Sequence, residues 1–427
     1  MIKKTLLILI IFFGRQQVCV SQTINNTLIK ADKLFIKHEY ESAAKGYEHY
    51  LKSYPKDYYA SRQAAICYKK TNNQDKAIDH WPNVIESSKV TDEDRLDYAK
   101  CLLANYRVQD ARMMINFLKT SQDKAIAAWG QAYTSFDQFY LDSAITKVKE
   151  VIGVNTTETE FCPLISNNKL IFASEKNKKD RIFTAKGSDN KSELSSAEKK
   201  DDINFFDIKL FAKQIKSSGL NGQVSLSADE SVMYFSRSVS SKELKKVSES
   251  VFYKFQIYSG NPHAEKTEVS APFIYNSADY DCMHPSISKD GLKLYFASDM
   301  KGTYGGKDIF VCEWINGAWS TPKNLGILIN TPGDEVFPNI TEEGTLYFAS
   351  DNRPGLGGLD IFYAEPNKDD GSFFTPKNAG FPINTQFDDY GVYILKGGKS
   401  GYFSSNRKNN LQDDDIYFFS KDQEVIR

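Results

Sequence analysis

Residues that could ligate transition metals or act as thiol nucleophiles are scarce in this sequence. Its 427 residues include only five histidines and six cysteines. Five of the cysteines follow residue 21, and this odd number, at this spacing, fits neither a zinc site nor a dense disulfide framework. We expect them to be small buried hydrophobic residues, and we predict no metal site and no cofactor. The five are Cys67, Cys101, Cys162, Cys282 and Cys312.

An excess of positive charge is also absent. The 54 Lys and Arg are offset by 55 Asp and Glu, which gives a formal net charge of −1. Domains that bind nucleic acid are usually basic, so we expect no nucleic-acid partner. The hydrophobic share of 41%, the charged share of 26% and the mean hydropathy of −0.47 are typical of a globular protein. No run after residue 21 is long and apolar enough to predict a membrane-spanning helix.

The short motifs of common enzyme classes are missing as well. The sequence contains no G-x-S-x-G elbow, Walker loop, H-E-x-x-H or C-x-x-C. Two histidines fall in the second half of the chain, and one of them, His284, occupies the place that Phe337 holds in the next repeat. We expect a packed position for His284. We therefore predict no catalytic residues and no enzyme activity.

The N-terminal segment, residues 1–21, has the layout of a secretory signal. Lys3 and Lys4 precede a short apolar run over 6–13, and the small residues Val20 and Ser21 end the segment. We predict export and removal of this segment, which places the mature protein in the periplasm, in association with the outer membrane. Lipidation of Cys19 is the alternative, although Cys19 follows Val18 and not a small residue.

A 34-residue period runs through the first part of the chain. Small and large apolar residues recur at this step, and within each unit they sit at helical spacing. Each unit therefore predicts two amphipathic helices, at about 27–37 and 40–53 in the first unit. The series are Ala31, Ala65 and Ala99; Ala43, Ala77 and Ala111; and Tyr47, Trp81 and Ile115.

This pattern resembles the tetratricopeptide repeat family over residues 24–150. The resemblance implies a curved helical solenoid whose first helices line a groove for peptides. Tyr59, Arg62, Lys69 and Lys100 would lie in that groove and make part of it basic, which suits a carboxylate or an acidic segment. The alternative is a solvated helix face that binds nothing.

A second, longer period begins near residue 161. Short aromatic strands recur at 170–174, 233–236, 294–298, 346–350 and 401–405, and each is followed by another strand. The second strand of each pair is predicted at 181–183, 256–258, 308–310, 360–362 and 415–417. Gly305-Gly306 and Gly357-Gly358 lie between the paired strands, where we expect hairpin turns with positive φ. Four strands in each such repeat indicate the blades of a β-propeller.

The propeller is predicted to close on itself. Residues 151–155 match the outer-strand motif but precede the first complete unit, whereas the last unit ends without an outer strand. We expect residues 151–155 to pair with residues 415–419, which removes two exposed sheet edges. The fold class is thus an α-helical solenoid over 24–150 followed by a β-propeller over 151–427. Five blades are predicted, or six if residues 175–215 form another.

Several aspartates recur at the same place in successive repeats. Asp308, Asp360 and Asp415 form one series, and Asp299 and Asp351 form another. A ring of carboxylates could bind a cation or a sugar. Recurrence in several blades favours the alternative, in which each carboxylate accepts backbone N–H groups in a turn.

The propeller repeats resemble the WD40-like periplasmic propellers of TolB-like proteins. The match is carried by residues 285–291, 294–299 and 305–310 and by their counterparts in 337–362. Helical repeats followed by such a propeller resemble PorE-like envelope proteins of Bacteroidota. That resemblance implies protein partners in the cell envelope and a place in an outer-membrane complex, such as the type IX secretion and gliding machinery.

These observations leave three functional hypotheses. The leading one is a non-catalytic protein-interaction scaffold of the periplasm or outer membrane. The second is a glycan-binding or glycan-cleaving, sialidase-like propeller, and the third is a peptidoglycan-associated adaptor. The discriminating feature for the second would be aromatic and acidic residues gathered at one mouth of the propeller.

Overall fold

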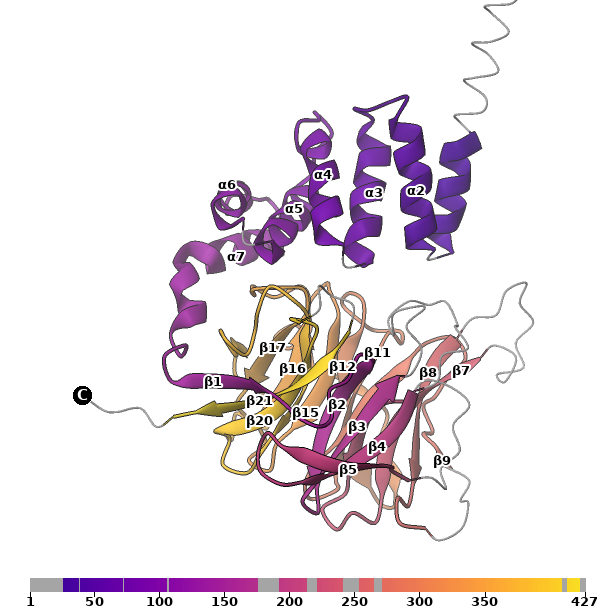
Figure 1. Cartoon of the computed structure of the whole chain (residues 1–427), viewed down its shortest axis with the longest axis vertical. Coiled ribbons are helices and arrows are strands. Elements are labelled where there is room, and N and C mark those ends of the chain that lie inside the picture. The colour runs from indigo at the N-terminus through magenta and orange to yellow at the C-terminus, as the bar shows by residue number, and fades with distance from the viewer. Residues whose placement is uncertain are drawn as a thin grey trace, which may run out of the picture. The chain divides into compact units, whose positions relative to one another are not determined.

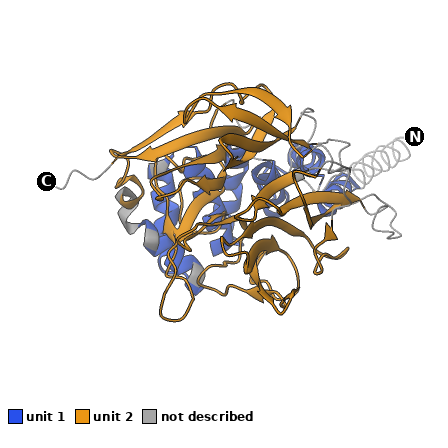
Figure 2. Ribbon diagram, turned by 90° about the horizontal axis from the view of Figure 1, so that it is seen from below, with its two compact units in different colours: residues 1–134 blue, residues 135–427 orange. Residues whose placement is uncertain are grey.

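The computed structural model describes residues 26–37, 39–71, 73–105, 107–175, 192–212, 221–240, 253–264, 271–408 and 413–422. The chain divides into two compact units, residues 1–134 and residues 135–427 (Figure 2). The division lies before the predicted boundary at 150/151, because the segment that precedes residue 151 pairs with the propeller. The predicted signal segment 1–21 and Cys19 lie outside the described residues.

The first unit consists of helices in pairs (Figure 1). A helical segment over 26–36 precedes α2, and the helices of like position begin at a constant step, at 40, 74 and 108 and at 58 and 92. The helical pairs predicted from the sequence period are therefore confirmed. The helices are α2 (Tyr40–Leu51), α3 (Tyr58–Lys70), α4 (Gln74–Ile85), α5 (Asp92–Ala104), α6 (Val108–Leu118) and α7 (Lys124–Ala132).

Local sequence sets both the ends and the spacing of these helices. Asp57 caps α3 by accepting the backbone N–H of Ala60, and Thr91 forms a capping box with Asp94 at the start of α5. A Cβ atom at Gly46 would lie 2.8 Å from the Cβ of Ala31, so the glycine allows α2 to approach the first helical segment. The apolar residues that recur at the repeat step are buried between the helices.

The second unit is a five-bladed β-propeller built from antiparallel sheets. Blade 1 contains β2 (Thr159–Ser166), β3 (Lys169–Glu175), β4 (Ser192–Lys199) and β5 (Phe205–Leu210). Blade 2 contains β6 (Asn221–Leu226), β7 (Met233–Ser240), β8 (Tyr253–Gly260) and β9 (Ala271–Pro272). Blade 3 contains β10 (Cys282–Ile287), β11 (Lys293–Ser298), β12 (Asp308–Ile315), β13 (Ala318–Trp319) and β14 (Lys323–Asn324).

Blades 4 and 5 complete the ring (Figure 1). Blade 4 contains β15 (Glu335–Ile340), β16 (Leu346–Ser350), β17 (Asp360–Ala364) and β18 (Lys377–Asn378), and blade 5 contains β19 (Asp389–Ile394), β20 (Ser400–Ser405), β21 (Asp415–Lys421) and β1 (Thr146–Glu150). The alternative of six blades is wrong, because the segment after β3 supplies β4 and β5 of blade 1. The strand predicted at 181–183 lies outside the described residues, and the strand that pairs with β3 is β4.

The ring closes between the two ends of the propeller chain, as predicted, but with a different strand. β1 pairs with β21 from Thr146 opposite Lys421 to Glu150 opposite Tyr417. The prediction of 151–155 as the outer strand is wrong, because only Val151 continues this pairing, through its N–H to the carbonyl of Ile416 at 3.1 Å. Ile152 already pairs with Asn204 of blade 1, so this segment crosses from one blade to the next.

In several linkers that lead into a blade, an asparagine side chain bonds the backbone of the preceding blade. We call this arrangement a latch. The side-chain amide of Asn155 donates to the carbonyl of Ile416 at 2.9 Å and accepts its N–H at 2.9 Å. The same two bonds join Asn276 to Ile257, Asn330 to Ile309 and Asn384 to Ile361. Each latch ties the segment leading into one blade to the third strand of the blade before it.

The recurring aspartates have structural partners. Asp308 and Asp360 accept backbone N–H groups of the loops that precede them, and Asp299 and Asp351 accept those of Asp281 and Asp334. For these four, the structural interpretation is confirmed. The predicted positive φ at the paired glycines is wrong, since none of the four has it. Instead, a Cβ atom at Gly305 would collide with the backbone of Pro332 in the next linker.

Side chains from all five blades fill the axis of the propeller among the described residues. One apolar cluster includes Phe161, Val224, Met283, Phe337 and Tyr390, which come from successive blades. His284 is 3% exposed and stacks on Phe337 with ring centroids 3.7 Å apart, so the packed position predicted for it is confirmed. Burial holds the pKa of His284 well below its usual value.

Among the described residues, no helix has both the length and the apolar character that a bilayer crossing requires. The five cysteines after residue 21 are buried and unpaired with one another, as expected.

The latch at the ring closure is testable with Asn155→Ala. Loss of both hydrogen bonds to Ile416 should lower the free energy of unfolding of the propeller by about 1–3 kcal/mol, because two buried backbone groups lose their partner. Chemical denaturation followed by tryptophan fluorescence measures this change. Lys149→Ala is the control, since its exposed side chain leaves the β1–β21 ladder intact. Equal stability of the two variants would contradict the latch.

Candidate functional site

The residues predicted to form a basic groove lie on α3 and α5, and their charges are offset within the protein. The Nε of Arg62 donates to Oδ1 of Asp94 at 2.5 Å, and Nζ of Lys69 lies 2.6 Å from Oδ1 of Asp97. The charge of Lys100 also acts on Asp97, and the pKa of that carboxyl is below its usual value although burial alone would raise it. These interactions reduce the positive charge that the predicted groove can offer to an acidic ligand.

The fourth groove residue, Tyr59, is 44% exposed, and its hydroxyl donates to Oδ1 of Asp32 at 3.0 Å. Sequence reasoning missed the acidic partners of Arg62 and Lys69. They could have been found, because Asp94 and Asp97 follow Arg62 and Lys69 by 32 and 28 residues and so lie on the equivalent helix of the next repeat. Ion pairs at this step join neighbouring repeats rather than a repeat and its ligand.

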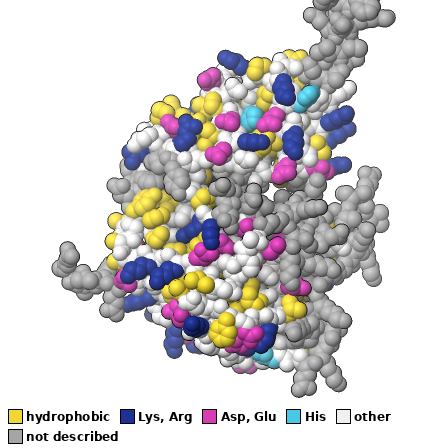
Figure 3. All heavy atoms as spheres, in the orientation of Figure 1, with side chains coloured by type: hydrophobic (Ala, Val, Ile, Leu, Met, Phe, Trp, Pro, Cys, Tyr) yellow, Lys and Arg dark blue, Asp and Glu magenta, His cyan; other side chains and the backbone are white. Residues whose placement is uncertain are grey.

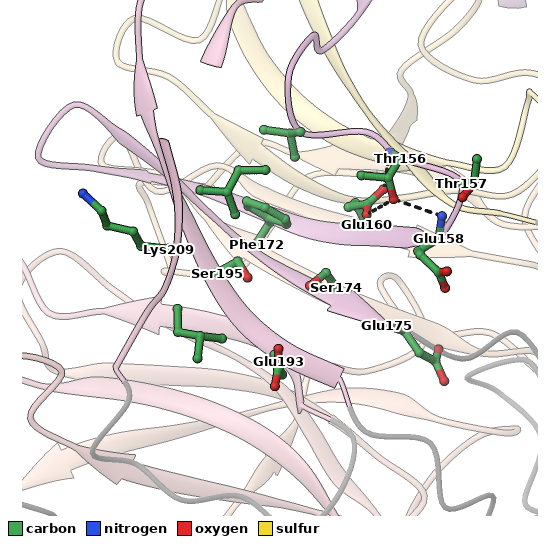
Figure 4. A pocket seen from close by; sticks show the side chains of 13 residues that line it. Thr156, Thr157, Glu158, Glu160, Phe172, Ser174, Glu175, Glu193, Ser195 and Lys209 are labelled. Carbon is green, nitrogen blue, oxygen red and sulfur yellow. Dashed lines mark hydrogen bonds between the residues drawn. The ribbon is translucent and has the colours of Figure 1, made fainter. Parts of the chain in front are cut away.

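A pocket of about 440 Å³ lies in blade 1 (Figure 4). Strand register explains its composition, since residues directly opposite in antiparallel strands share a face. Across β2, β3 and β4, one row consists of Glu160, Ser174 and Glu193. Across β3, β4 and β5, the next row consists of Phe172, Ser195 and Leu210. All six side chains line the pocket.

The segment that closes the ring forms the opposite wall of the pocket. Val154, Thr156 and Glu158 line it, and Val154 belongs to the apolar cluster that packs blade 5 on blade 1. The backbone N–H of Thr156 donates to Oε2 of Glu160 at 2.9 Å, and its hydroxyl donates to Oε1 at 2.8 Å (Figure 4). The pocket therefore exists where the chain crosses from blade 5 to blade 1.

The pocket is acidic above an apolar floor. Among the described residues, Glu158, Glu160, Glu175 and Glu193 line it, and so does Lys209, whose Nζ lies 2.5 Å from the carboxylate of Asp207. The pKa of Glu160 is raised to about 6, mainly by burial, with smaller contributions from the charges of Asp415 and Glu158. The floor includes Phe172, which is 2% exposed.

The outer strand of blade 1 exposes three large apolar side chains. Phe206, Ile208 and Leu210 of β5 are 54%, 47% and 46% exposed, and the last two also line the pocket. Figure 3, in the orientation of Figure 1, shows hydrophobic side chains on the surface where β5 runs. Among the described residues, no strand pairs with the outer edge of β5, and Phe205 at its start donates its N–H to the carbonyl of Ile152 at 3.0 Å. Exposed apolar residues on an edge strand are typical of a surface that pairs with another chain.

These features suit a cationic group with an apolar body. Carboxylates attract the charge, and the aromatic floor accepts the body. Among the described residues, no group of three or more His, Cys, Asp or Glu is placed to hold a metal ion. Among the described lining residues, Phe172 is the one aromatic residue, and it is 2% exposed.

Sequence reasoning missed this pocket because Glu193 and Ser195 fall in a polar segment that interrupts the repeat pattern. A signal was present in the match of Asn155-Thr156 and Glu160 to the later linkers. This match predicts the linker, but it does not predict which side chains of blade 1 lie around the linker.

Comparisons with known proteins find no family for this chain. No protein-family model matches it, and no curated protein matches it. TolB from Acinetobacter baumannii is 16% identical over 63% of this chain and 56% of TolB, with a TM-score of 0.33. A protein of unknown function from Dyadobacter fermentans is 12% identical over 61% of this chain and 79% of its own, with a TM-score of 0.37. An exo-β-1,3-galactanase from Clostridium thermocellum is 10% identical over 64% and 61%, with a TM-score of 0.39. These likenesses assign no function.

The Arg62–Asp94 pair is testable with Arg62→Met. The side chain of Asp94 is fully buried, so losing its partner should lower the free energy of unfolding of the helical unit by about 1–3 kcal/mol. Thermal denaturation followed by the helical circular dichroism signal measures this change. Arg112→Met, at an exposed position of α6, is the control and should leave the transition unchanged.

Stability should depend on pH through Glu160. Its pKa is raised from 4.5 to about 6, so the folded protein holds the proton more tightly than the unfolded chain. The free energy of unfolding should therefore fall as the pH rises from about 4.5 to about 6, by on the order of 1–2 kcal/mol from this group. Asp415, whose pKa is also raised to about 6, adds a change of the same sign.

Glu160→Gln should flatten this part of the profile, measured by urea denaturation between about pH 4 and pH 8. Glu343→Gln, at an exposed turn of blade 4, is the control. An unchanged slope in Glu160→Gln would mean that Glu160 titrates as an ordinary carboxyl.

Proposed function

We propose that the protein is a non-catalytic protein-interaction scaffold of the periplasm or the outer membrane. In this proposal the helical unit is a tetratricopeptide solenoid, the second unit is a TolB-like propeller, and the edge of blade 1 receives a protein partner. The observation that carries the proposal is the exposure of three large apolar residues on β5, Phe206, Ile208 and Leu210, of which the last two line the pocket.

Two further features support a binding role over a catalytic one. The described residues pack the axis of the propeller with apolar side chains, and the pocket of blade 1 lies away from this axis, beside β5. An edge strand pairs with another chain through its backbone, and neighbouring side chains then select the partner. Such a surface binds polypeptide without any reacting group.

The cellular part of the proposal rests on sequence alone. The pattern of residues 1–21 indicates export, and the PorE-like arrangement of helical repeats and propeller suggests an envelope complex such as the type IX secretion and gliding machinery. Peptidoglycan association is a weaker alternative, for which the described residues offer no specific feature.

Crosslinking in isolated envelopes tests the proposal, with Phe206→Ser/Ile208→Ser as the variant. The wild-type chain should form crosslinks to one reproducible protein, and these should include Lys209, which is exposed beside the pocket. The double variant should lose this partner, because the apolar contact on β5 is removed. Partner identification and crosslink mapping by mass spectrometry give the readout.

Ile274→Ser is the matched control, because Ile274 is 72% exposed but lies in the linker between blades 2 and 3. It should retain the partner. Recovery of the same partner by the double variant, or of no reproducible partner by the wild type, would contradict the proposal.

A further inference from the structure

The linker into blade 4, residues 325–330, forms a turn with apolar residues at its tip. Ile327 is 74% exposed and Leu328 is 44% exposed. The next residue, Ile329, is 1% exposed and belongs to the apolar cluster that packs blade 3 on blade 4. The turn is therefore anchored in the core, while two large apolar side chains at its tip face solvent.

Hydrogen bonds fix the backbone of this turn. Gly326 has a φ of 84°, its N–H donates to Oδ1 of Asn324 at 2.8 Å, and its carbonyl accepts the N–H of Asn330 at 2.9 Å. Nη2 of Arg353 donates to the carbonyl of Leu328 at 2.5 Å. The turn is thus held in one conformation without a ligand, which lowers the entropic cost of binding to it.

The linker into blade 5 forms the same turn around Gly380. This glycine has a φ of 73°, its N–H donates to Oδ1 of Asn378 at 2.7 Å, and its carbonyl accepts the N–H of Asn384 at 2.9 Å. In both linkers the residue after the glycine lies at the tip of the turn. Phe381 in this linker is therefore the counterpart of Ile327.

Another segment of the chain covers the turn at Gly380. The N–H of Phe381 donates to the carbonyl of Phe139 at 2.7 Å, and the ring centroids of Tyr140 and Phe381 lie 5.3 Å apart. A Cβ atom at Gly380 would lie 2.9 Å from the same carbonyl oxygen. What covers this turn is a backbone carbonyl followed by an aromatic side chain.

The linker into blade 1 is also covered, although it is one residue shorter, from 151 to 155 instead of from 325 to 330. The N–H of Ile152 donates to the carbonyl of Ile203 at 2.7 Å. A Cβ atom at Gly153 would collide with the carbonyl of Phe205. In two linkers, an N–H of the turn therefore bonds a carbonyl from a distant segment, and apolar residues accompany that carbonyl.

The turn of blade 4 has no such cover among the described residues. The N–H of Ile327 donates to no acceptor there. A Cβ atom at Gly326 would meet no described atom within 4 Å, whereas the carbonyl of Phe139 lies at this place above Gly380. The turn thus offers a free donor and exposed apolar side chains in the conformation that binds a peptide segment in blade 5.

We infer that the turn formed by Gly326, Ile327 and Leu328 is a docking surface for another polypeptide. The partner supplies a backbone carbonyl to the N–H of Ile327 and an aromatic side chain that covers Ile327 and Leu328. The occupants of the two counterpart turns are both peptide segments, which favours a polypeptide over a lipid surface. This surface is separate from the one proposed on β5 and does not depend on it.

Methyl NMR of the full chain with labelled isoleucine tests the inference. The probe is the blocked tetrapeptide Gln-Phe-Tyr-Leu, the sequence of residues 138–141 that includes the segment covering blade 5. The signal of Ile327, assigned from its absence in Ile327→Val, should shift in a saturable way with a Kd on the order of 1 mM, since the contact is small. A probe with alanine in place of the tyrosine should bind about fivefold more weakly.

A double variant and a matched control separate this surface from other apolar residues. Ile327→Ser/Leu328→Ser should weaken binding at least about fivefold, measured by saturation transfer to the rings of the peptide, because the apolar contact is lost. Both side chains are exposed, so the thermal transition should be retained. Leu292→Ser is the control, since Leu292 is 48% exposed at the β10–β11 turn and its N–H already donates to Asp290.

Several outcomes would overturn the inference. These are the absence of a saturable shift at Ile327, undiminished binding in the double variant, or equal binding of the tyrosine and alanine probes. Binding to phosphatidylcholine vesicles that the double variant loses would identify a lipid surface as the occupant and would also overturn it. Phe206→Ser/Ile208→Ser should bind the peptide as the wild type does, so loss of its protein partner bears on the proposed function and not on this surface.

Discussion

The propeller depends on the contact between the beginning and the end of its own chain. β1 adds the outer strand to β21, and the amide of Asn155 exchanges two hydrogen bonds with Ile416, a residue 261 positions away. Without this contact, blade 5 would lack a strand and the ring would have two open edges. The other latches repeat the same chemistry between neighbouring blades, but only this one joins the ends of the ring.

The same closure creates the candidate site. Because residues 151–158 must cross from blade 5 to blade 1, they bring Thr156 and Glu158 over a face of blade 1 that already holds Glu160 and Phe172. In blades 4 and 5 the equivalent space is filled by Arg353 and Arg407, which stabilise the linker. The corresponding place in blade 1 directly follows Glu175 and lies outside the described residues.

In the helical unit, the charged residues of a single helix do not show whether its surface is basic, because residues of the next repeat can pair with them. Arg62 and Lys69 have the spacing of a basic helix face, and the resemblance to tetratricopeptide repeats implied that this face lines a groove for acidic peptides. Each is paired with an aspartate of the following repeat, Asp94 or Asp97. Ion pairs between repeats hold neighbouring helices in register, whereas a ligand-binding face needs charges that the fold leaves available. The paired glycines at 305–306 and 357–358 show the same effect, since they are required by the approach of the next linker and not by their own turns.

Local periodicity in the sequence was sufficient for the helical pairs, the five blades and the closure of the ring. A helical repeat with alanines at fixed places, or a strand repeat with aromatic residues at fixed places, can bury its apolar face only by stacking on its neighbours. The strand that closes the ring was misplaced by one short segment, because residues 151–155 carry the linker motif and β1 carries none. The pocket was not predictable, since Val154, Phe172, Ser195 and Leu210 meet only through pairing across strands. A sequence pattern determines what each segment buries, but a cavity depends on what neighbouring segments leave unfilled, and only the tertiary structure decides that.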